Sequence, residues 1–258
     1  MGVAKNGVRP WCVRLLGGFE LLSPTGPVEV PLGIQRLLAY VALQERSVMR
    51  ARVAADLWPE AVGARAGTNL RSTLWRANRL GPLLACTTQS LRLTDGVVVD
   101  VAELAAAAEH MHAGGIAQAP FLAAFNLELL PGWQEDWVTL ERERLRQLEL
   151  RVLDFLVMDR AERGRLGEAL DAALRAIRLE PLRELSHRHL IHLYVASGNR
   201  TAALTHYEGF ANLLHRELDL SPEPATTALV EPFLRMRPGR YRPRATSRGG
   251  GARSSVFR

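Results

Sequence analysis

Residues 68–80, TNLRSTLWRANRL, are the most informative stretch of the chain. At about 3.6 residues per turn, its apolar residues fall on one side of a helix: Leu70, Leu74 and Ala77, flanked by Thr73 and Leu80. The opposite side carries Thr68, Arg71, Ser72, Trp75, Arg76 and Arg79. No carboxylate occurs between Glu60 and Asp95, so this side suits a polyanion, and we interpret it as a DNA recognition helix. The alternative interpretation of an isolated basic helix is an ordinary solvated face.

The composition is that of a globular protein with room for two domains. The chain has 258 residues, 47% of them hydrophobic, and a mean hydropathy of −0.04. No apolar run approaches the roughly 18 residues of a membrane span, and the N-terminus lacks the apolar core of a signal peptide. We therefore expect a cytoplasmic protein that does not contact a membrane.

Charge divides the chain into three parts. Residues 1–99 hold 12 basic and 6 acidic side chains, residues 100–234 hold 13 and 21, and residues 235–258 hold 8 and none. Such asymmetry indicates that one part meets nucleic acid while another has a different task.

The part before residue 100 has the pattern of a winged helix-turn-helix. Three short apolar runs separated by turn formers predict a small antiparallel sheet: residues 11–16, 19–22 and 28–32. Apolar residues at helical spacing then predict two helices, residues 34–43 and 50–58. The loop 60–67 leads into the helix 68–80. Two final strands, residues 83–87 and 91–93, predict a hairpin with Arg92 near its tip.

These segments resemble the DNA-binding domain of SARP-type bacterial transcriptional activators, whose winged helix is similar to that of OmpR-type response regulators. The more specific marks are LWP at residues 57–59 and the pattern RxxLWRxxRL at residues 71–80. The resemblance implies that the third helix enters the major groove and that the hairpin wing approaches the neighbouring minor groove. It implies DNA contacts by Arg71, Ser72, Thr73, Trp75, Arg76 and Asn78, with Arg92 on the wing. Thr68 and Arg79 of the basic side complete the predicted DNA-binding set.

Helices dominate the sequence from residue 100 onward. Residues 101–112 and 137–163 predict two helices, the second long and amphipathic. Gly164, Ala169 and Leu170 recur 34 residues later as Gly198, Ala203 and Leu204, each set inside a helix–turn–helix pattern. A period of about 34 residues with paired helices is typical of tetratricopeptide-like repeats, which bind proteins.

Residues 129–156 and 180–224 resemble the bacterial transcriptional activation domain that follows the winged helix in the same family. The predicted fold class is mainly α, with an N-terminal winged helix-turn-helix of α+β type followed by an all-helical tetratricopeptide-like domain. The predicted organisation is a flexible N-terminus at 1–10, the DNA-binding domain at 11–99, the helical activation domain at 100–235 and a basic disordered tail at 236–258.

Catalytic and metal sites are not predicted. His189 and His192 share a helical face, but His187 points elsewhere and no carboxylate completes a ligand set. Glu141 and Glu143 lie in an alternating charged run, which is typical of a solvated helix face. The chain has two isolated cysteines without metal-ligand spacing, which we expect to be reduced, and it lacks a phosphate-binding glycine loop and a nucleophile elbow. We expect neither an enzyme nor a cofactor.

Two classes of function remain. The first is a sequence-specific activator that binds double-stranded promoter DNA through residues 68–80. It would recruit RNA polymerase through the loop 60–67 and the helical domain, or form a homodimer on DNA. The second is a tetratricopeptide-like interaction scaffold whose winged helix no longer reads DNA. The basic side of residues 68–80 separates the two, because a scaffold has no need to keep it free of acidic residues.

Overall fold

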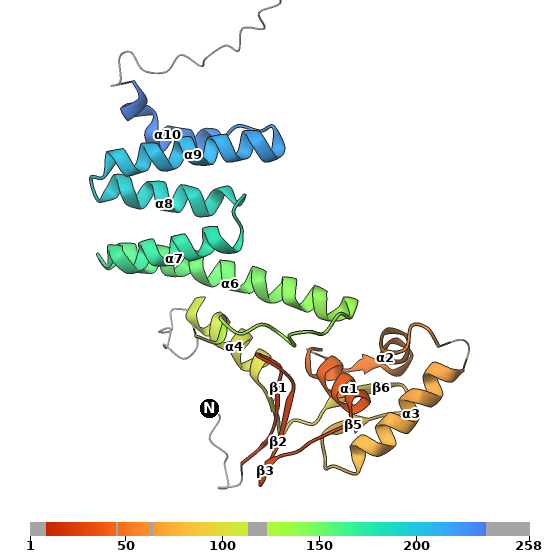
Figure 1. Ribbon diagram of the computed structural model, residues 1–258. Helices are drawn as coiled ribbons and strands as arrows, with labels where there is room; N and C mark the ends of the chain where they lie inside the picture. Colours follow the sequence, from red (N-terminus) through yellow and green to blue (C-terminus); the bar gives the residue numbers. More distant parts are fainter. Residues whose placement is uncertain (1–8, 45, 62–63, 113–122, 236–258) are drawn as a thin grey trace, which may run out of the picture. The chain divides into compact units, whose positions relative to one another are not determined.

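The computed structural model describes residues 9–44, 46–61, 64–112 and 123–235 (Figure 1). The chain forms two compact units, Met1–Asp159 and Arg160–Arg258. The predicted basic tail and all but two residues of the predicted flexible N-terminus lie outside the described residues. Within the described residues, every helix is too short or too polar to cross a membrane.

A four-stranded sheet with the order β3-β2-β1-β7 begins the first unit. Strand β1 (Trp11–Arg14) pairs antiparallel with β2 (Glu20–Ser23), which pairs with the short β3 (Gly26–Pro27). Strand β7 (Val97–Val99) returns from far along the chain and pairs parallel with β1. The inward side chains of Val13 and Leu21 are fully or almost fully buried.

The sequence-based prediction of this sheet is confirmed only in part. A strand was expected at residues 28–32, and this expectation is wrong, because the sheet ends at Pro27 and a helix begins at Leu32. Pro27 and Pro31 have no backbone N–H to donate to a strand ladder, which explains why the apolar run does not extend the sheet. Strand β7 was not predicted.

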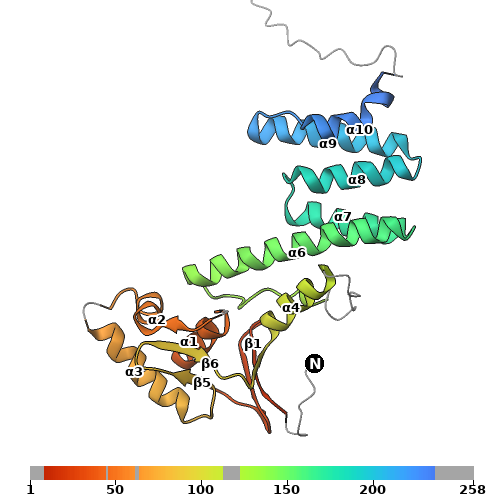
Figure 2. The same ribbon diagram turned by 180° about the vertical axis from the view of Figure 1, so that it is seen from behind.

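Three helices and a second sheet complete the winged helix-turn-helix. The helices are α1 (Leu32–Ala42), α2 (Arg50–Leu57) and α3 (Arg65–Asn78). The second sheet has the order β4-β6-β5 and consists of β4 (Val48–Met49), β5 (Leu84–Cys86) and β6 (Ser90–Leu93). The β5–β6 hairpin lies beside α3 in both views (Figures 1 and 2). The predicted fold class is confirmed for this part of the chain.

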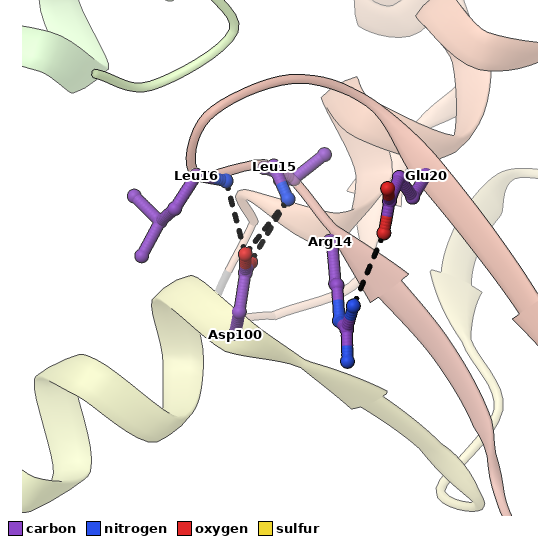
Figure 3. A network of polar contacts seen from close by, with 5 residues as sticks. All are labelled: Arg14, Leu15, Leu16, Glu20 and Asp100. Atoms are coloured by element: carbon purple, nitrogen blue, oxygen red, sulfur yellow. Dashed lines mark hydrogen bonds and ion pairs between the residues drawn. The ribbon is translucent and has the colours of Figure 1, made fainter. Parts of the chain in front are cut away.

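Asp100 joins the beginning and the end of the first sheet (Figure 3). It is the first residue of α4 (Asp100–His112), directly after β7. Its two carboxylate oxygens accept hydrogen bonds from the backbone N–H of Leu15 at 3.0 and 2.9 Å, and one of them also accepts from Leu16 at 2.9 Å. The carboxylate further accepts from the N–H of Val101 at 2.8 Å, at the start of the helix. Because Leu15 is completely buried, water cannot replace this acceptor.

The start of α6 (Asp136–Glu162) also packs within the first unit. The Trp137 ring meets the Tyr40 ring of α1 edge-on, with 5.3 Å between centroids. Arg36 of α1 pairs with Glu135 at 2.8 Å. The guanidinium of Arg142 donates to the carbonyl oxygens of Leu129 and Leu130, at 2.9 and 2.6 Å. The boundary expected after residue 99 therefore stays a prediction, because the chain beyond it continues to pack in this unit.

The second unit is a stack of antiparallel helices in chain order (Figures 1 and 2): α7 (Leu166–Leu179), α8 (Glu184–Ala196), α9 (Arg200–Leu218) and α10 (Pro224–Leu234). The predicted repeat is visible in its turns and its packing. Gly164 and Gly198 adopt the left-handed conformation, with φ of +72° and +75°, which glycine adopts without steric cost. Five residues further on, Ala169 and Ala203 are completely buried. The tetratricopeptide-like prediction is confirmed.

Two imidazoles stack inside the second unit. Nε2–H of His187 donates to the carbonyl of Pro181 at 2.9 Å, so Nδ1 of the neutral ring is left to accept from Nε2–H of His206 at 3.0 Å. The His187 ring also stacks on Phe210, 3.9 Å between centroids. Burial first, and the neighbouring His187 second, lower the pKa of His206 to about 4. Burial also lowers the pKa of His187, against the opposing effects of the Pro181 carbonyl and Glu184.

We expect Asp100→Ala to lower the free energy of unfolding by about 2–6 kcal/mol, because two N–H groups at buried or half-buried residues lose their acceptor at about 1–3 kcal/mol each. The matched control is Glu20→Ala, which removes the exposed pair with Arg14 at 3.1 Å (Figure 3). An exposed pair contributes less than about 1 kcal/mol. Equilibrium unfolding in urea measures both variants, and equal losses would contradict the role given to Asp100.

We expect the second unit to lose stability as the pH falls from about 6.5 to about 4. The unfolded chain protonates its histidines near pH 6.5, whereas His206 in the folded chain has a pKa of about 4. The unfolded state therefore binds more protons in this window, at about 1.4 kcal/mol per pH unit for each imidazole. Urea unfolding at several pH values measures the slope. In His206→Gln the slope should be smaller, and an identical slope in both proteins would contradict the assignment.

Candidate nucleic-acid interface

The outward face of α3 presents most of the predicted DNA-binding residues together. Seven of them are exposed: Thr68, Arg71, Ser72, Trp75, Arg76, Asn78 and Arg79. The opposite face is buried against the core through Leu70, Leu74 and Ala77, at 2%, 4% and 0% exposure. Burial of one face therefore fixes the direction of the other.

Local hydrogen bonds hold two of the three arginines on this face. The guanidinium of Arg71 donates to Oγ1 of Thr68 at 2.9 Å, and Nε of Arg76 donates to the carbonyl of Ser72 at 3.3 Å. Arg79 lies over the Trp75 ring, with its Cζ 5.0 Å from the ring centroid. Within the described parts of the chain, none of these three guanidinium groups pairs with a carboxylate. Three positive charges thus remain available to an anion.

A shallow hollow of about 460 Å³ lies on the same face, lined by Arg71, Ser72, Trp75 and Arg76. Its lining combines cationic, hydroxyl and aromatic groups. These are the groups that contact phosphates, base edges and apolar groups of DNA, respectively.

Thr73 does not belong to this face. Its side chain is only 3% exposed, and its hydroxyl donates to the carbonyl of Asn69 at 2.9 Å, one turn earlier in the helix. The expectation that Thr73 contacts DNA is therefore wrong for this conformation, because the side chain flanks the buried residues rather than the exposed ones.

Helix α3 begins earlier than predicted. It starts at Arg65 and not at Thr68, so the last three residues of the expected loop 60–67 are helical. No capping side chain marks the start, because Ala64 occupies the N-cap position, and the sequence therefore gave no signal for it. Residues 62 and 63 of the expected loop lie outside the described residues.

The wing differs from the prediction in the position of its cation. Arg92 lies in β6 opposite Ala85, below the turn at residues 87–89, and not near the tip. It forms an ion pair with Asp95, and the hydrogen bond from Arg92 lowers the pKa of that carboxyl group. Asp95 thus offsets the Arg92 charge. A DNA contact by Arg92 stays a prediction.

Arg50, which the sequence did not single out, lies at the wing tip instead. Its backbone N–H donates to the carbonyl of Gln89 at 2.8 Å, and its guanidinium donates to the carbonyl of Thr87 at 3.2 Å. Pairing of β4 with β6, Met49 opposite Ser90, brings the start of α2 to this turn. Because that pairing joins segments about 40 residues apart, periodicity along the sequence could not reveal it.

The alternative metal site is not formed. His187 is buried, and both of its ring nitrogens are used by Pro181 and His206. Among the residues that the structure describes, no three His, Cys, Asp or Glu side chains are placed to hold a metal ion. Cys12 and Cys86 are both free thiols, as expected.

Comparison with known proteins agrees with this architecture. Residues 98–234, more than half of the chain, match the family model of the bacterial transcriptional activator domain. The fold is similar to that of Mycobacterium tuberculosis EmbR in complex with a low affinity phosphopeptide, with a TM-score of 0.64 and 23% sequence identity. This similarity covers 89% of the present chain and 66% of the EmbR chain, so the present chain spans just under two thirds of that structure. No curated protein matches the sequence. The chain belongs to the bacterial transcriptional activator domain family.

Proposed function

We propose that this regulator is a sequence-specific DNA-binding activator that reads promoter DNA with α3. The observation that carries the proposal is a face of three arginines, none of which pairs with a carboxylate of the described residues, on a helix whose other face is buried. A helix with side chains is about 10–12 Å wide and fits the major groove, which is about 12 Å wide.

The residues of this face would make different kinds of contact with DNA. Arg71 and Arg76 flank the hollow, where a guanidinium can hold a phosphate or donate two hydrogen bonds to guanine O6 and N7. Ser72 and Asn78 are exposed on the same face and can donate to base edges or phosphates. Thr68 positions Arg71 through their 2.9 Å hydrogen bond.

The wing provides a second contact, and we assign its cation to Arg50. The Arg50 guanidinium donates to the Thr87 carbonyl at the turn, so its charge is held beside the turn of the hairpin. A backbone phosphate, or the negative potential of a narrow minor groove, attracts such a cation.

The helical module supplies the activating function in this proposal. It pairs protomers into a homodimer on DNA or recruits RNA polymerase, together with residues 60–67, the last three of which belong to α3. The stacked helices of the second unit support this role, because such stacks present protein-binding surfaces. A protein with this task works in the bacterial cytoplasm, where the chromosome lies, and needs neither a cofactor nor catalysis.

We expect the full chain to select a defined DNA sequence from a random pool, and Arg71→Ala with Arg76→Ala to weaken that complex. Each lost phosphate contact reduces the slope of log K against log salt by about 0.9, so the slope should fall by about two if both arginines hold phosphates. The matched control is Arg216→Ala with Arg235→Ala, which removes the same charge from exposed sites of the second unit. Equal slopes in the two double variants would contradict the assignment, and failure of the wild type to select any DNA would favour the scaffold.

We expect Arg50→Ala to weaken binding several-fold on all sequences and to reduce the salt slope by about one. Arg92→Ala should have a smaller effect, because Asp95 already offsets that charge. Fluorescence anisotropy at several salt concentrations measures both. If Arg92→Ala weakens binding more than Arg50→Ala does, the cation of the wing that contacts DNA is Arg92, as the sequence predicted.

A further inference from the structure

Trp75 is a large aromatic side chain on the exposed, otherwise polar face of α3. Its side chain is 62% exposed, although tryptophan is usually well buried. It lies on the outward face between arginines and contributes nothing to the buried side of the helix. The exposed indole offers a large apolar surface to a ligand within a cationic face, and it lines the hollow on that face.

The surroundings of Trp75 hold the indole in place. The Arg79 guanidinium lies 5.0 Å from the ring centroid, within the range of a cation–π interaction. The remaining indole surface forms a wall of the 460 Å³ hollow whose other lining residues are Arg71, Ser72 and Arg76. The hollow therefore offers one apolar wall among positive and hydrogen-bonding groups.

Only one kind of DNA group fits an apolar wall at the base edges. In the major groove each base pair presents hydrogen-bond donors and acceptors, and the C5-methyl group of thymine is the single apolar feature. The surrounding arginines favour a polyanion, and this argues against an apolar protein segment as the occupant. We propose that Trp75 is a specificity-determining residue that recognises a thymine methyl group; this rests on the proposed function of α3 as a DNA reader.

The size of the effect follows from one methyl group. Burial of one CH₂-sized group stabilises by about 0.8 kcal/mol, which corresponds to about fourfold in affinity. Deoxyuridine differs from thymidine only by this methyl group, so replacing one thymine by uracil leaves base pairing and hydrogen bonding at that position unchanged.

The test uses the full chain and its selected DNA sequence, with each thymine replaced in turn by uracil and the Kd measured by anisotropy. For the wild type we expect a thymine position at which replacement by uracil weakens binding about fourfold. In Trp75→Ala the ratio of the two Kd values should fall to about one, whereas Trp75→Phe should keep an intermediate ratio. Arg50→Ala, which changes the wing and does not line the hollow, should weaken both complexes and keep the ratio of four. Since Trp75 is exposed, circular dichroism should be identical for all variants.

Two outcomes would overturn the proposal while leaving DNA binding intact. The first is a selected site without a uracil-sensitive thymine, and the second is a ratio of four that survives Trp75→Ala. If the first outcome is found and Trp75→Ala weakens the binding of both DNAs equally, the indole contacts the sugar-phosphate backbone. If the wild type selects no DNA, both the proposed function and this inference fail.

Discussion

The first unit depends on the hydrogen bonds that the Asp100 carboxylate accepts. It accepts from Leu15 and Leu16 at 2.9–3.0 Å and so joins the end of β1 to the junction of β7 and α4. Strands β1 and β7 are the first and last strands of the unit, and α1, α2 and α3 lie between them in the sequence. A parallel pair closed in this way fixes both ends of the segment that carries α3. Closing this segment has an entropic cost. The hydrogen bonds to the Asp100 carboxylate offset that cost, because a hydrogen bond to a charged acceptor is stronger than one to a neutral acceptor.

The outward face of α3 carries charges that no carboxylate neutralises within the described residues, and the free-energy cost of those charges is small. Arg76 and Arg79 are three residues apart, and a like-charge pair at this spacing costs about 0.2–0.5 kcal/mol. Arg76 lies in the last turn of α3, where a cation gains about 0.3–1 kcal/mol from the helix dipole. The two effects nearly cancel. The buried residues Leu70 and Leu74 can therefore hold α3 in place while its outer face stays free of acidic partners.

Local patterns in the sequence predict the features that depend on neighbouring residues, and they fail where distant segments meet. The buried side of α3 and the Gly164/Gly198 repeat follow from periodicity, and the structure confirms both. Strand β7 and the position of Arg50 depend on pairing between segments that are far apart in sequence, so no local pattern signals them. Thr73 shows a second limit: helical periodicity placed it beside the buried residues, where the structure has it, and its DNA contact was implied only by the family resemblance.

The unit that carries α3 is larger than a winged helix. The family match begins at residue 98, yet the contacts of Trp137 with Tyr40 and of Glu135 with Arg36 place the start of α6 in the first unit. Trp133 adds a stacked contact with Phe19, 6.5 Å between centroids. Removing the segment after β7 would expose these aromatic partners on α1 and on the first sheet. Because α1 packs directly against α3, a single element, α1, separates the start of α6 from α3.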